Sequence, residues 1–500
     1  MKHLLAISLV LTIASAPTAA GNTADFDHLD DFIEEVHVAT GHPFGTAVAV
    51  VKDGEVLYEG YFGFSDIGQE TPVTRDTVFY VASATKPFFA LNALLLEHEG
   101  RLDTRMSLQR MFPGASFAGL GAEVVDIRDL LVHTSGIDNP GMVWATAYSG
   151  LHDDVSRRRL VAHSRASDTP RGTFNYSNVG YNILSVWMDD HVGVPWQEQL
   201  DEQIFNPLGM ERTSARVSEA EGLRWPLAKP YSFASEDPRE PLYLAKVDNT
   251  MQAAGGILST APDLAKFVLA QMPVDSGSAG ATLPASVLER SHEVQVQLED
   301  SFLDFQRSGY AWGWYAGDYK NRSMLHHFGG FAGFHAHLSF LPEEGVGLVV
   351  LNNDDFLGAR VTSLIADYVY GVLLGQQRNV PEMAQRFVEL RVDALKFRAW
   401  ARDHRNEVQG REWHLSLPHS AYAGIYRNDL LGELSINVSS NSTMQVEWGR
   451  LSTFATGLPE PDNVRVELVP NSGTAMSFRV DGRRVQALEL EGMEFRRVQQ

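Results

Sequence analysis

The stretch from Phe79 to Leu96 constrains this chain more than any other. It is apolar almost throughout, and the only Ser-x-x-Lys pair of the sequence, Ser83 and Lys86, lies within it. Residues three apart on a helix have Cβ atoms roughly 5–6 Å apart, so a helix that begins near Ser83 brings the hydroxyl and the amine together. Pro87 agrees with this start, because proline is best tolerated in the first turn of a helix.

This pair has the chemistry of a nucleophile and its base. A serine hydroxyl attacks poorly at neutral pH unless a neighbour takes its proton and nearby donors stabilise the oxyanion. Burial and the positive end of a helix dipole both disfavour an ammonium, so both lower the pKa of Lys86 toward that of a usable base. The alternative interpretation is a capping serine beside a solvated lysine, although apolar surroundings are unusual for a solvated face.

The composition is that of an ordinary soluble globular protein, with 44% hydrophobic and 21% charged residues in a chain of 500. This length predicts two or three domains. A formal charge of −22 argues against nucleic acid or an anionic membrane as a partner, since either needs a basic face. The chain has no cysteine, which excludes thiolate nucleophiles, thiolate metal sites and a lipid-anchoring cysteine.

Residues 1–20 have the layout of a secretory signal peptide. A basic start precedes the apolar run from Leu4 to Ile13, and small residues follow up to Ala20, where we expect cleavage. The apolar run is too short to span a hydrocarbon core of ~30 Å. We therefore expect export to the periplasm or the medium, without a stable membrane anchor.

Three further parts follow in the sequence. Residues 25–375 mix helical and strand patterns, with an early hairpin and late strand-like runs, and predict an α+β or α/β domain whose first and last segments share one sheet. Residues 376–415 are charged and helical in character, as in a linker. Residues 416–500 contain short β-rich runs between turn residues, which predict a small all-β barrel or sandwich. The strand-like runs of the first part cover 309–315, 333–341 and 346–352.

Two stretches rich in turn residues are candidates for segments that border the site of Ser83. From Asn139 to Gly172 the periodicity weakens, as in a long surface segment over a site, where Trp144 and Tyr148 either line a pocket or pack locally. Farther on, Gly329 and Gly330 allow the backbone to approach a ligand closely. A free N–H there could complete an oxyanion hole with the N–H of the serine, and a flexible turn is the alternative.

A tyrosine and an asparagine two residues apart stand at the start of an apolar helix. These are Tyr176 and Asn178, and the helix runs to about His191. At a junction between a loop and a helix both side chains can face one cleft. Because Tyr-x-Asn also occurs at Tyr319 and Tyr426, only its position well downstream of the serine favours the first copy.

A metal site is a competing hypothesis. Four histidines, His326, His327, His335 and His337, lie close together, and the last two fall on one face of a predicted strand, where they could ligate zinc. The Asp-His continuation typical of zinc hydrolases with His-x-His is missing. We therefore expect no metal and no cofactor.

Three motifs in this order resemble those of the serine β-lactamase and penicillin-binding-protein superfamily: Ser83-Ala84-Thr85-Lys86, Tyr176-Ser177-Asn178 and His327-Phe328-Gly329. The second is similar to that of class C β-lactamases, D-Ala-D-Ala carboxypeptidases, D-aminopeptidases and family VIII esterases. Leu130 to Ile137, Pro207 to Met210 and Gly255 to Thr260 match as well. The resemblance covers about residues 25–375 and implies an antiparallel sheet flanked by helices. The tail resembles the lipocalin-like β domain behind some of these hydrolases.

The resemblance implies a role for each motif residue. Ser83 would be the nucleophile that accepts the acyl group, and Lys86 the base that activates it. Tyr176 would relay protons to the leaving group and activate water, while Asn178 would hold the lysine or the substrate amide. The N–H of Gly330, directly after the third motif, would pair with that of the serine around the oxyanion.

The third motif departs from the β-lactamase pattern. Similar β-lactamases have a lysine that helps to attract the substrate carboxylate, and this chain has His327, a residue type that is mostly neutral at pH 7. The departure favours a D-amino-acid peptidase or a carboxylesterase over efficient β-lactam turnover. We expect an exported serine hydrolase acting on a small-molecule or short-peptide amide or ester. A receptor that forms a stable acyl adduct, or binds wall peptides, is the alternative, and the oligomeric state stays open.

Overall fold

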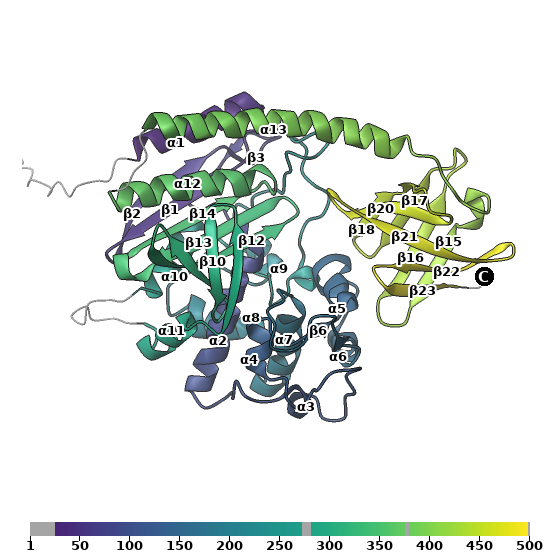
Figure 1. Ribbon diagram of the computed structural model, residues 1–500, viewed down its shortest axis with the longest axis horizontal. Coiled ribbons are helices and arrows are strands. Elements are labelled where there is room, and N and C mark those ends of the chain that lie inside the picture. Colours follow the sequence, from purple (N-terminus) through teal and green to yellow (C-terminus); the bar gives the residue numbers. More distant parts are fainter. Residues whose placement is uncertain (1–25, 273–281, 376–379, 499–500) are drawn as a thin grey trace, which may run out of the picture.

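The computed structural model describes residues 26–272, 282–375 and 380–498, so the expected signal peptide, residues 1–20, lies outside the described residues. An eight-stranded antiparallel sheet with helices on both faces forms the larger part, and a nine-stranded antiparallel sheet follows near the C-terminal end (Figure 1). The predicted fold class is confirmed. Over the residues that the structure describes, no helix combines the length and the apolar character that crossing a bilayer requires.

The strands of the large sheet stand in the order β2-β1-β14-β13-β12-β11-β10-β9, and β1 pairs with β14. The first and last strands of this sheet along the chain thus lie side by side, next to the edge strand β2, as the sequence predicts. The eight strands are β1 (Thr46–Lys52), β2 (Glu55–Phe62), β9 (Val296–Phe302), β10 (Phe305–Tyr310), β11 (Tyr315–Tyr319), β12 (Arg322–Phe331), β13 (Phe334–Leu341) and β14 (Val346–Asn352).

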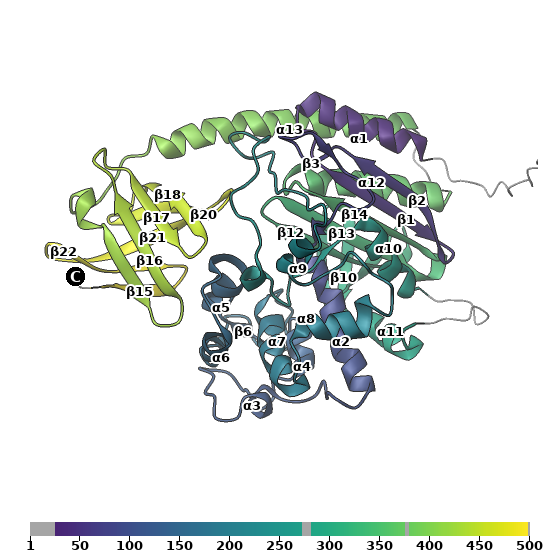
Figure 2. The same cartoon turned by 180° about the vertical axis from the view of Figure 1, so that it is seen from behind.

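Both faces of this sheet are buried. On one face, Val48 and Val50 of β1 belong to a core with α1 (Asp27–Thr40), α12 (Leu357–Leu373) and α13 (Val380–Gln409). On the other, Ala47 and Ala49 belong to a core with α2 (Lys86–His98) and α10 (Ala261–Ala270). Figure 2 shows α1 lying along α13 over the same face. Burial on both faces explains why β14, which pairs with β1, is apolar from Val346 to Leu351.

Further helices belong to this part of the chain. They are α3 (Leu108–Met111), α4 (Ile127–Leu131), α5 (Pro140–Trp144), α6 (Asp154–Ala162), α7 (Val179–Val192), α8 (Trp196–Leu200), α9 (Val217–Gly222) and α11 (Ala285–His292). Three two-stranded pairs complete this part: β3 (Phe64–Asp66) with β4 (Thr71–Pro72), β5 (Phe79–Tyr80) with β8 (Leu258–Ser259), and β6 (Ile137–Asp138) with β7 (Arg165–Ala166).

The predicted surface segment from Asn139 to Gly172 is wrong, because it contains α5, a π-helical turn at Ala145–Ser149 and α6. The polar residues that suggested a loop are helix caps. The Asn139 side chain accepts a hydrogen bond from the N–H of Met142, and Asp153 caps α6 in the same way. A capping residue and a loop residue give the same sequence signal.

The predicted strand over 309–315 is also wrong, since the chain turns between β10 and β11. Gly313 has φ +82° in this turn, and a Cβ atom there would lie 2.7 Å from the carbonyl oxygen of Lys86. The turn is apolar because it packs against the start of α2. Conversely, Gly329 and Gly330 lie within β12 and not in a flexible turn.

The small sheet curls into a nearly closed barrel (Figure 1). The helix α13 runs from the large sheet toward this barrel, which lies beyond the C-terminal end of the helix. Trp448 of the barrel stacks on Trp144 with ring centroids 5.5 Å apart, and the N–H of Arg450 donates to the carbonyl of Ser149. The barrel therefore contacts the helical segment after α5. Its strands are β15 (Gly424–Asn428), β16 (Gly432–Val438), β17 (Met444–Trp448), β18 (Leu451–Phe454), β19 (Thr456–Gly457), β20 (Asn463–Val469), β21 (Ser472–Asp481), β22 (Arg484–Leu490) and β23 (Met493–Arg497).

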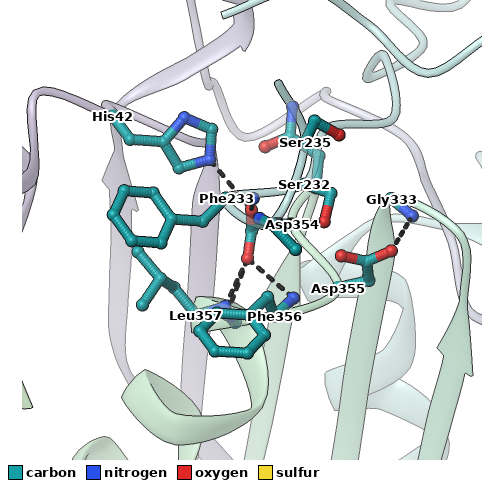
Figure 3. A network of polar contacts seen from close by, with 12 residues as sticks. His42, Ser232, Phe233, Ser235, Gly333, Asp354, Asp355, Phe356 and Leu357 are labelled. Atoms are coloured by element: carbon teal, nitrogen blue, oxygen red, sulfur yellow. Dashed lines mark hydrogen bonds and ion pairs between the residues drawn. The ribbon is translucent and has the colours of Figure 1, made fainter. Parts of the chain in front are cut away.

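Two adjacent carboxylates join distant segments at the end of β14 (Figure 3). Asp354 is fully buried, where it caps α12, accepts the N–H of Phe233 at 2.7 Å and contacts Nε2 of His42 at 2.9 Å. Asp355 accepts the N–H of Gly333, in the turn between β12 and β13, at 2.9 Å. Burial, followed by the charge of Asp354, raises the pKa of Asp355 to about 7.

We expect Asp355→Asn to stabilise the protein at pH 8. The folded state binds a proton at Asp355 up to about pH 7, whereas the unfolded state loses it near pH 4, so stability falls as pH rises through this window. Asparagine keeps an acceptor for Gly333 and carries no charge. The difference of about three pKa units sets an upper bound of about 4 kcal/mol on the gain at pH 8, and the gain vanishes near pH 4. Urea denaturation at several pH values measures it.

The exposed Asp481→Asn serves as the control and should leave the pH dependence of the unfolding free energy as it is in the wild type. A variant at 355 that loses stability equally at pH 5 and pH 8 would contradict the assignment of this titration.

Candidate active site

Ser83 lies in a single 3₁₀ turn, Ala82–Thr85, which leads directly into α2. Two hydrogen bonds clamp this turn to the loop before β8: the N–H of Val81 donates to the carbonyl of Ile257, and the N–H of Ile257 donates to the Thr85 hydroxyl. Ala82 has φ +47°, a conformation that costs energy for any residue except glycine. The surrounding contacts thus hold a strained turn that leaves the Ser83 side chain partly exposed.

Lys86 is completely buried at the first position of α2, with Pro87 in the same turn. Its Nζ lies 3.1 Å from the Ser83 hydroxyl, 2.9 Å from Oδ1 of Asn178 and 2.9 Å from the carbonyl oxygen of Ala254. Burial lowers the pKa of Lys86 well below its usual value. No carboxylate of the described residues forms an ion pair with it.

These three contacts suit a neutral amine. Asn178 Oδ1 and the Ala254 carbonyl can only accept, so the two N–H groups of the neutral amine point at them. Its lone pair then faces the Ser83 hydroxyl, at a distance suited to proton transfer.

Tyr176 lies on the other side of the lysine, just before α7. The centre of its ring is 4.6 Å from Lys86 Nζ, and its phenol is close enough to the Ser83 hydroxyl for that hydroxyl to affect its pKa. Desolvation raises the pKa of Tyr176 well above its usual value, and the Ser83 hydroxyl opposes this rise. Because the residue is 37% exposed, this desolvation is less complete than that of the lysine.

The environment thus moves the two pKa values in opposite senses. Around neutral pH the Lys86 amine is shifted toward its neutral form, which accepts a proton, while the Tyr176 phenol keeps its proton and can donate it. A base and an acid therefore flank one hydroxyl, as acyl transfer requires.

His327 of the third motif is buried and belongs to a hydrogen-bonded chain. Its Nδ1 faces the carbonyl of Phe328, so Nδ1 carries the proton and Nε2 accepts from the Tyr310 hydroxyl at 3.3 Å. Tyr310 in turn lies 3.2 Å from Nε2 of His133, whose Nδ1 accepts the N–H of Ser177. Burial lowers the pKa of both histidines well below the usual value, so both are neutral links.

Sequence reasoning did not identify Tyr310 and His133 as parts of the site. The chain that they form joins the third motif to Ser177, which stands between Tyr176 and Asn178. The signal for His133 was the segment from Leu130 to Ile137, which matched the superfamily without showing a function. Tyr310 gave no signal, because an apolar strand usually places tyrosines in a core.

The edge of β12 closes the site opposite the Ser83 turn. A Cβ atom on Gly329 would lie 1.8 Å from the carbonyl oxygen of Val81, so only glycine lets the turn pack against this strand. Phe331 pairs with Phe334 across a two-residue hairpin loop, so these two residues form a hydrogen-bonded pair. Hydrogen-bonded and non-hydrogen-bonded pairs alternate along an antiparallel ladder. The next pair, Gly330 with His335, is therefore not hydrogen-bonded, and the N–H of Gly330 points away from β13. On that side β12 pairs with β11 only up to His326, and Gly330 is exposed.

All seven residues predicted from the motifs therefore lie around one site, and their catalytic roles stay predictions. They are Ser83, Lys86, Tyr176, Asn178, His327, Gly329 and Gly330. Two of the histidines considered for zinc have other contacts: His337 lies 2.6 Å from the Ser339 hydroxyl, and His335 lies 3.4 Å from that of Thr362. Within the described part of the chain, no three His, Asp or Glu side chains converge as metal ligands.

We expect Tyr310→Phe to destabilise the protein by about 2 kcal/mol, because it leaves Nε2 of both His133 and His327 buried without a partner. Urea denaturation measures the loss. Tyr61→Phe is the control, since that half-buried hydroxyl donates only to Glu59 and should cost less than ~1 kcal/mol. Equal losses in the two variants would argue against the chain of hydrogen bonds.

Comparisons with known proteins agree with this geometry. A family model described as Beta-lactamase matches residues 29–368. Penicillin-binding protein 4 of Amycolatopsis lactamdurans is 30% identical over 349 residues, which are 68% of this chain and 87% of that protein. The unguisins hydrolase of Aspergillus violaceofuscus is 26% identical over 421 residues, 78% of this chain and 73% of that one.

Among solved structures, the octameric penicillin-binding protein homologue from Pyrococcus abyssi is 22% identical with a TM-score of 0.59. It covers 94% of this chain and 99% of its own, so the likeness of fold includes the C-terminal barrel. The family model spans the large sheet and all three motifs. The chain belongs to the beta-lactamase family, and it is a serine hydrolase of the group that includes the D-Ala-D-Ala carboxypeptidases.

Proposed function

We propose that this protein hydrolyses a small amide or ester through an acyl-enzyme on Ser83. One observation supports the proposal most: a fully buried lysine, with no counter-charge among the described residues, lies 3.1 Å from the hydroxyl of a partly exposed serine. A buried ammonium is costly unless it is paired. A neutral amine that accepts the serine proton accounts for the arrangement.

In the acylation step, the Lys86 amine takes the proton of Ser83 as its oxygen bonds to the substrate carbonyl carbon. The carbonyl oxygen becomes an oxyanion, which the N–H groups of Ser83 and Gly330 stabilise. When the bond to the leaving group breaks, the Tyr176 phenol protonates that group, and the Lys86 ammonium restores the phenol proton. Asn178 and the Ala254 carbonyl keep the amine in place throughout.

Deacylation uses the same groups in reverse. Water replaces the leaving group, loses its proton to the base formed by Tyr176 and Lys86, and attacks the acyl carbon. The acyl oxygen again develops charge between the two N–H groups. Collapse releases the acid and returns a proton to Ser83, so one substrate and one water give two products and the free enzyme.

The substrate proposal rests on His327. Its imidazole is neutral and fully engaged, so it offers no charge to the carboxylate of a β-lactam. We therefore favour a D-amino-acid peptide or a carboxylic ester over efficient β-lactam turnover. The layout of residues 1–20 supports the proposal that the hydrolase acts after export.

A panel of p-nitrophenyl esters, D-amino-acid anilides and a chromogenic cephalosporin tests the proposal with the wild type and Ser83→Ala. We expect turnover of at least one ester or anilide, reduced by roughly 10³-fold or more in the variant, because a catalytic unit depends strongly on its nucleophile. Ser308→Ala, an exposed serine on β10, should retain full activity.

A stoichiometric burst without turnover would instead identify a receptor that forms a stable adduct. Activity that survives Ser83→Ala and disappears with a chelator would support the zinc hypothesis and overturn the proposal.

We expect the acylation rate to rise with pH as Lys86 loses its proton, with a midpoint below the usual lysine value. Asn178→Asp places a carboxylate 2.9 Å from Nζ, which stabilises the ammonium and moves the midpoint to higher pH. Asn175→Asp adds the same charge at an exposed position, where solvent screens it. Single-turnover kinetics across pH compare them, and a midpoint shared by all three proteins would exclude Lys86 as the base.

A further inference from the structure

The acyl-transfer site lacks a cation at its third motif, because His327 is neutral and both ring nitrogens are engaged. A second lysine lies at the end of the same strand. Lys246 comes from the segment between α9 and the loop before β8, and its Nζ is 3.5 Å from the centre of the Phe331 ring. Phe331 directly follows Gly330, whose N–H we assign to the oxyanion.

The surroundings of Lys246 are elements of the active site. Its Nζ is 5.1 Å from the ring centre of Tyr80, which lies three residues before Ser83, and 5.9 Å from that of Tyr148. Tyr148 and Phe331 stack with centroids 5.8 Å apart. The amine therefore lies among three rings, two of which come from the segments that hold the nucleophile and the oxyanion strand.

Lys246 has no counter-charge among the residues that the structure describes. Nζ donates to two backbone carbonyls, those of Ala147 at 2.8 Å and Thr250 at 3.3 Å, which leaves one of its three N–H groups for another acceptor. Desolvation lowers its pKa well below the usual lysine value. The residue as a whole is only partly buried.

We propose that Lys246 binds a carboxylate of the substrate and so replaces the cation that the third motif lacks. This inference rests on the proposed function, since it selects carboxylate-bearing amides and esters among the substrates of the Ser83 site. Without a partner the buried amine favours its neutral form, as Lys86 does, and an incoming carboxylate supplies both the counter-charge that stabilises the ammonium and the acceptor for the remaining N–H. The aromatic rings around Nζ exclude water and strengthen that contact.

Arg307 is the rival cation near the site. Its guanidinium lies 3.6 Å from the centre of the Tyr315 ring, and its charge acts on Tyr176 and His327. It already has a carboxylate partner, however, in Asp300 at 3.3 Å. A substrate carboxylate would have to compete with that pair, whereas Lys246 has none to displace.

Binding to Ser83→Ala protein tests the proposal without turnover. The probes are N-acetyl-D-alanyl-D-alanine and its C-terminal amide, which differ only in the charged group, and NMR titration gives both dissociation constants. We expect the acid to bind at least tenfold more tightly than the amide, and this ratio to fall close to one when Lys246→Met is added. Lys246→Gln is a second variant in case methionine impairs folding, and Lys396→Met, exposed on α13, is the control that should keep the ratio.

A pair of ester substrates extends the test to a carboxylate on the acyl group of the substrate. Mono-p-nitrophenyl glutarate carries a terminal carboxylate, and p-nitrophenyl valerate is its neutral counterpart. We expect the ratio of their kcat/KM values to fall at least tenfold in Lys246→Met, mainly through KM, if the carboxylate lies on this side. The proposal is supported if either pair of probes shows a preference for the carboxylate and this preference depends on Lys246.

Absence of a carboxylate preference in both pairs overturns it, as does a preference that survives Lys246→Met and disappears in Arg307→Gln. These outcomes differ from failure of the proposed function. A chain that hydrolyses valerate through Ser83 but ignores the carboxylate retains that function and loses only the role of Lys246. A chain that forms no acyl-enzyme still reports on Lys246 through the binding ratio.

Discussion

The site depends on one interaction, the contact of a desolvated amine with a serine hydroxyl. In the mechanism that we propose, Lys86 can be a base because the segments around it, among the described residues, enclose it without supplying a negative charge. Asn178, just before α7, and Ala254, in the loop before β8, each provide a neutral acceptor in place of a carboxylate. A carboxylate would make the buried lysine a stable ammonium and end its use as a base, so the energy that folding loses here is the source of the reactivity.

The third motif shows how one substitution can change the kind of interaction at a site. With a lysine this position would supply charge, and with His327 it supplies a neutral link between Tyr310 and its own strand. The chain through His133 then ties the strand of the oxyanion hole to the segment that holds the acid and the amide. At this position a neutral hydrogen bond that holds the strand in place replaces a positive charge that would attract the substrate. Any recognition of a negatively charged substrate group is then left to residues outside the motif.

The sequence predicted the motif residues and the fold class because both rest on local rules. The spacing of Ser83 and Lys86, the hairpin around Asp53 and the pairing of early with late strands follow from period and turn chemistry. The errors arose where one signal has two structural causes. Asn139 and Asp153 cap helices with the same side chains that form loops, and the Gly313 turn is apolar because it packs on α2. Tyr310 became visible only in three dimensions, since its partners are 177 and 17 residues away.

The pairing of β1 with β14 has a consequence for how the protein is made. Thr46 and Asn352 share a hydrogen bond across 306 residues, so the centre of the sheet cannot close until nearly the whole hydrolase part has left the ribosome. Contacts of such long range form slowly. Until then β1 and β13 each present an unpaired edge whose side chains are buried in the finished sheet, and such edges are sites where an incomplete chain aggregates.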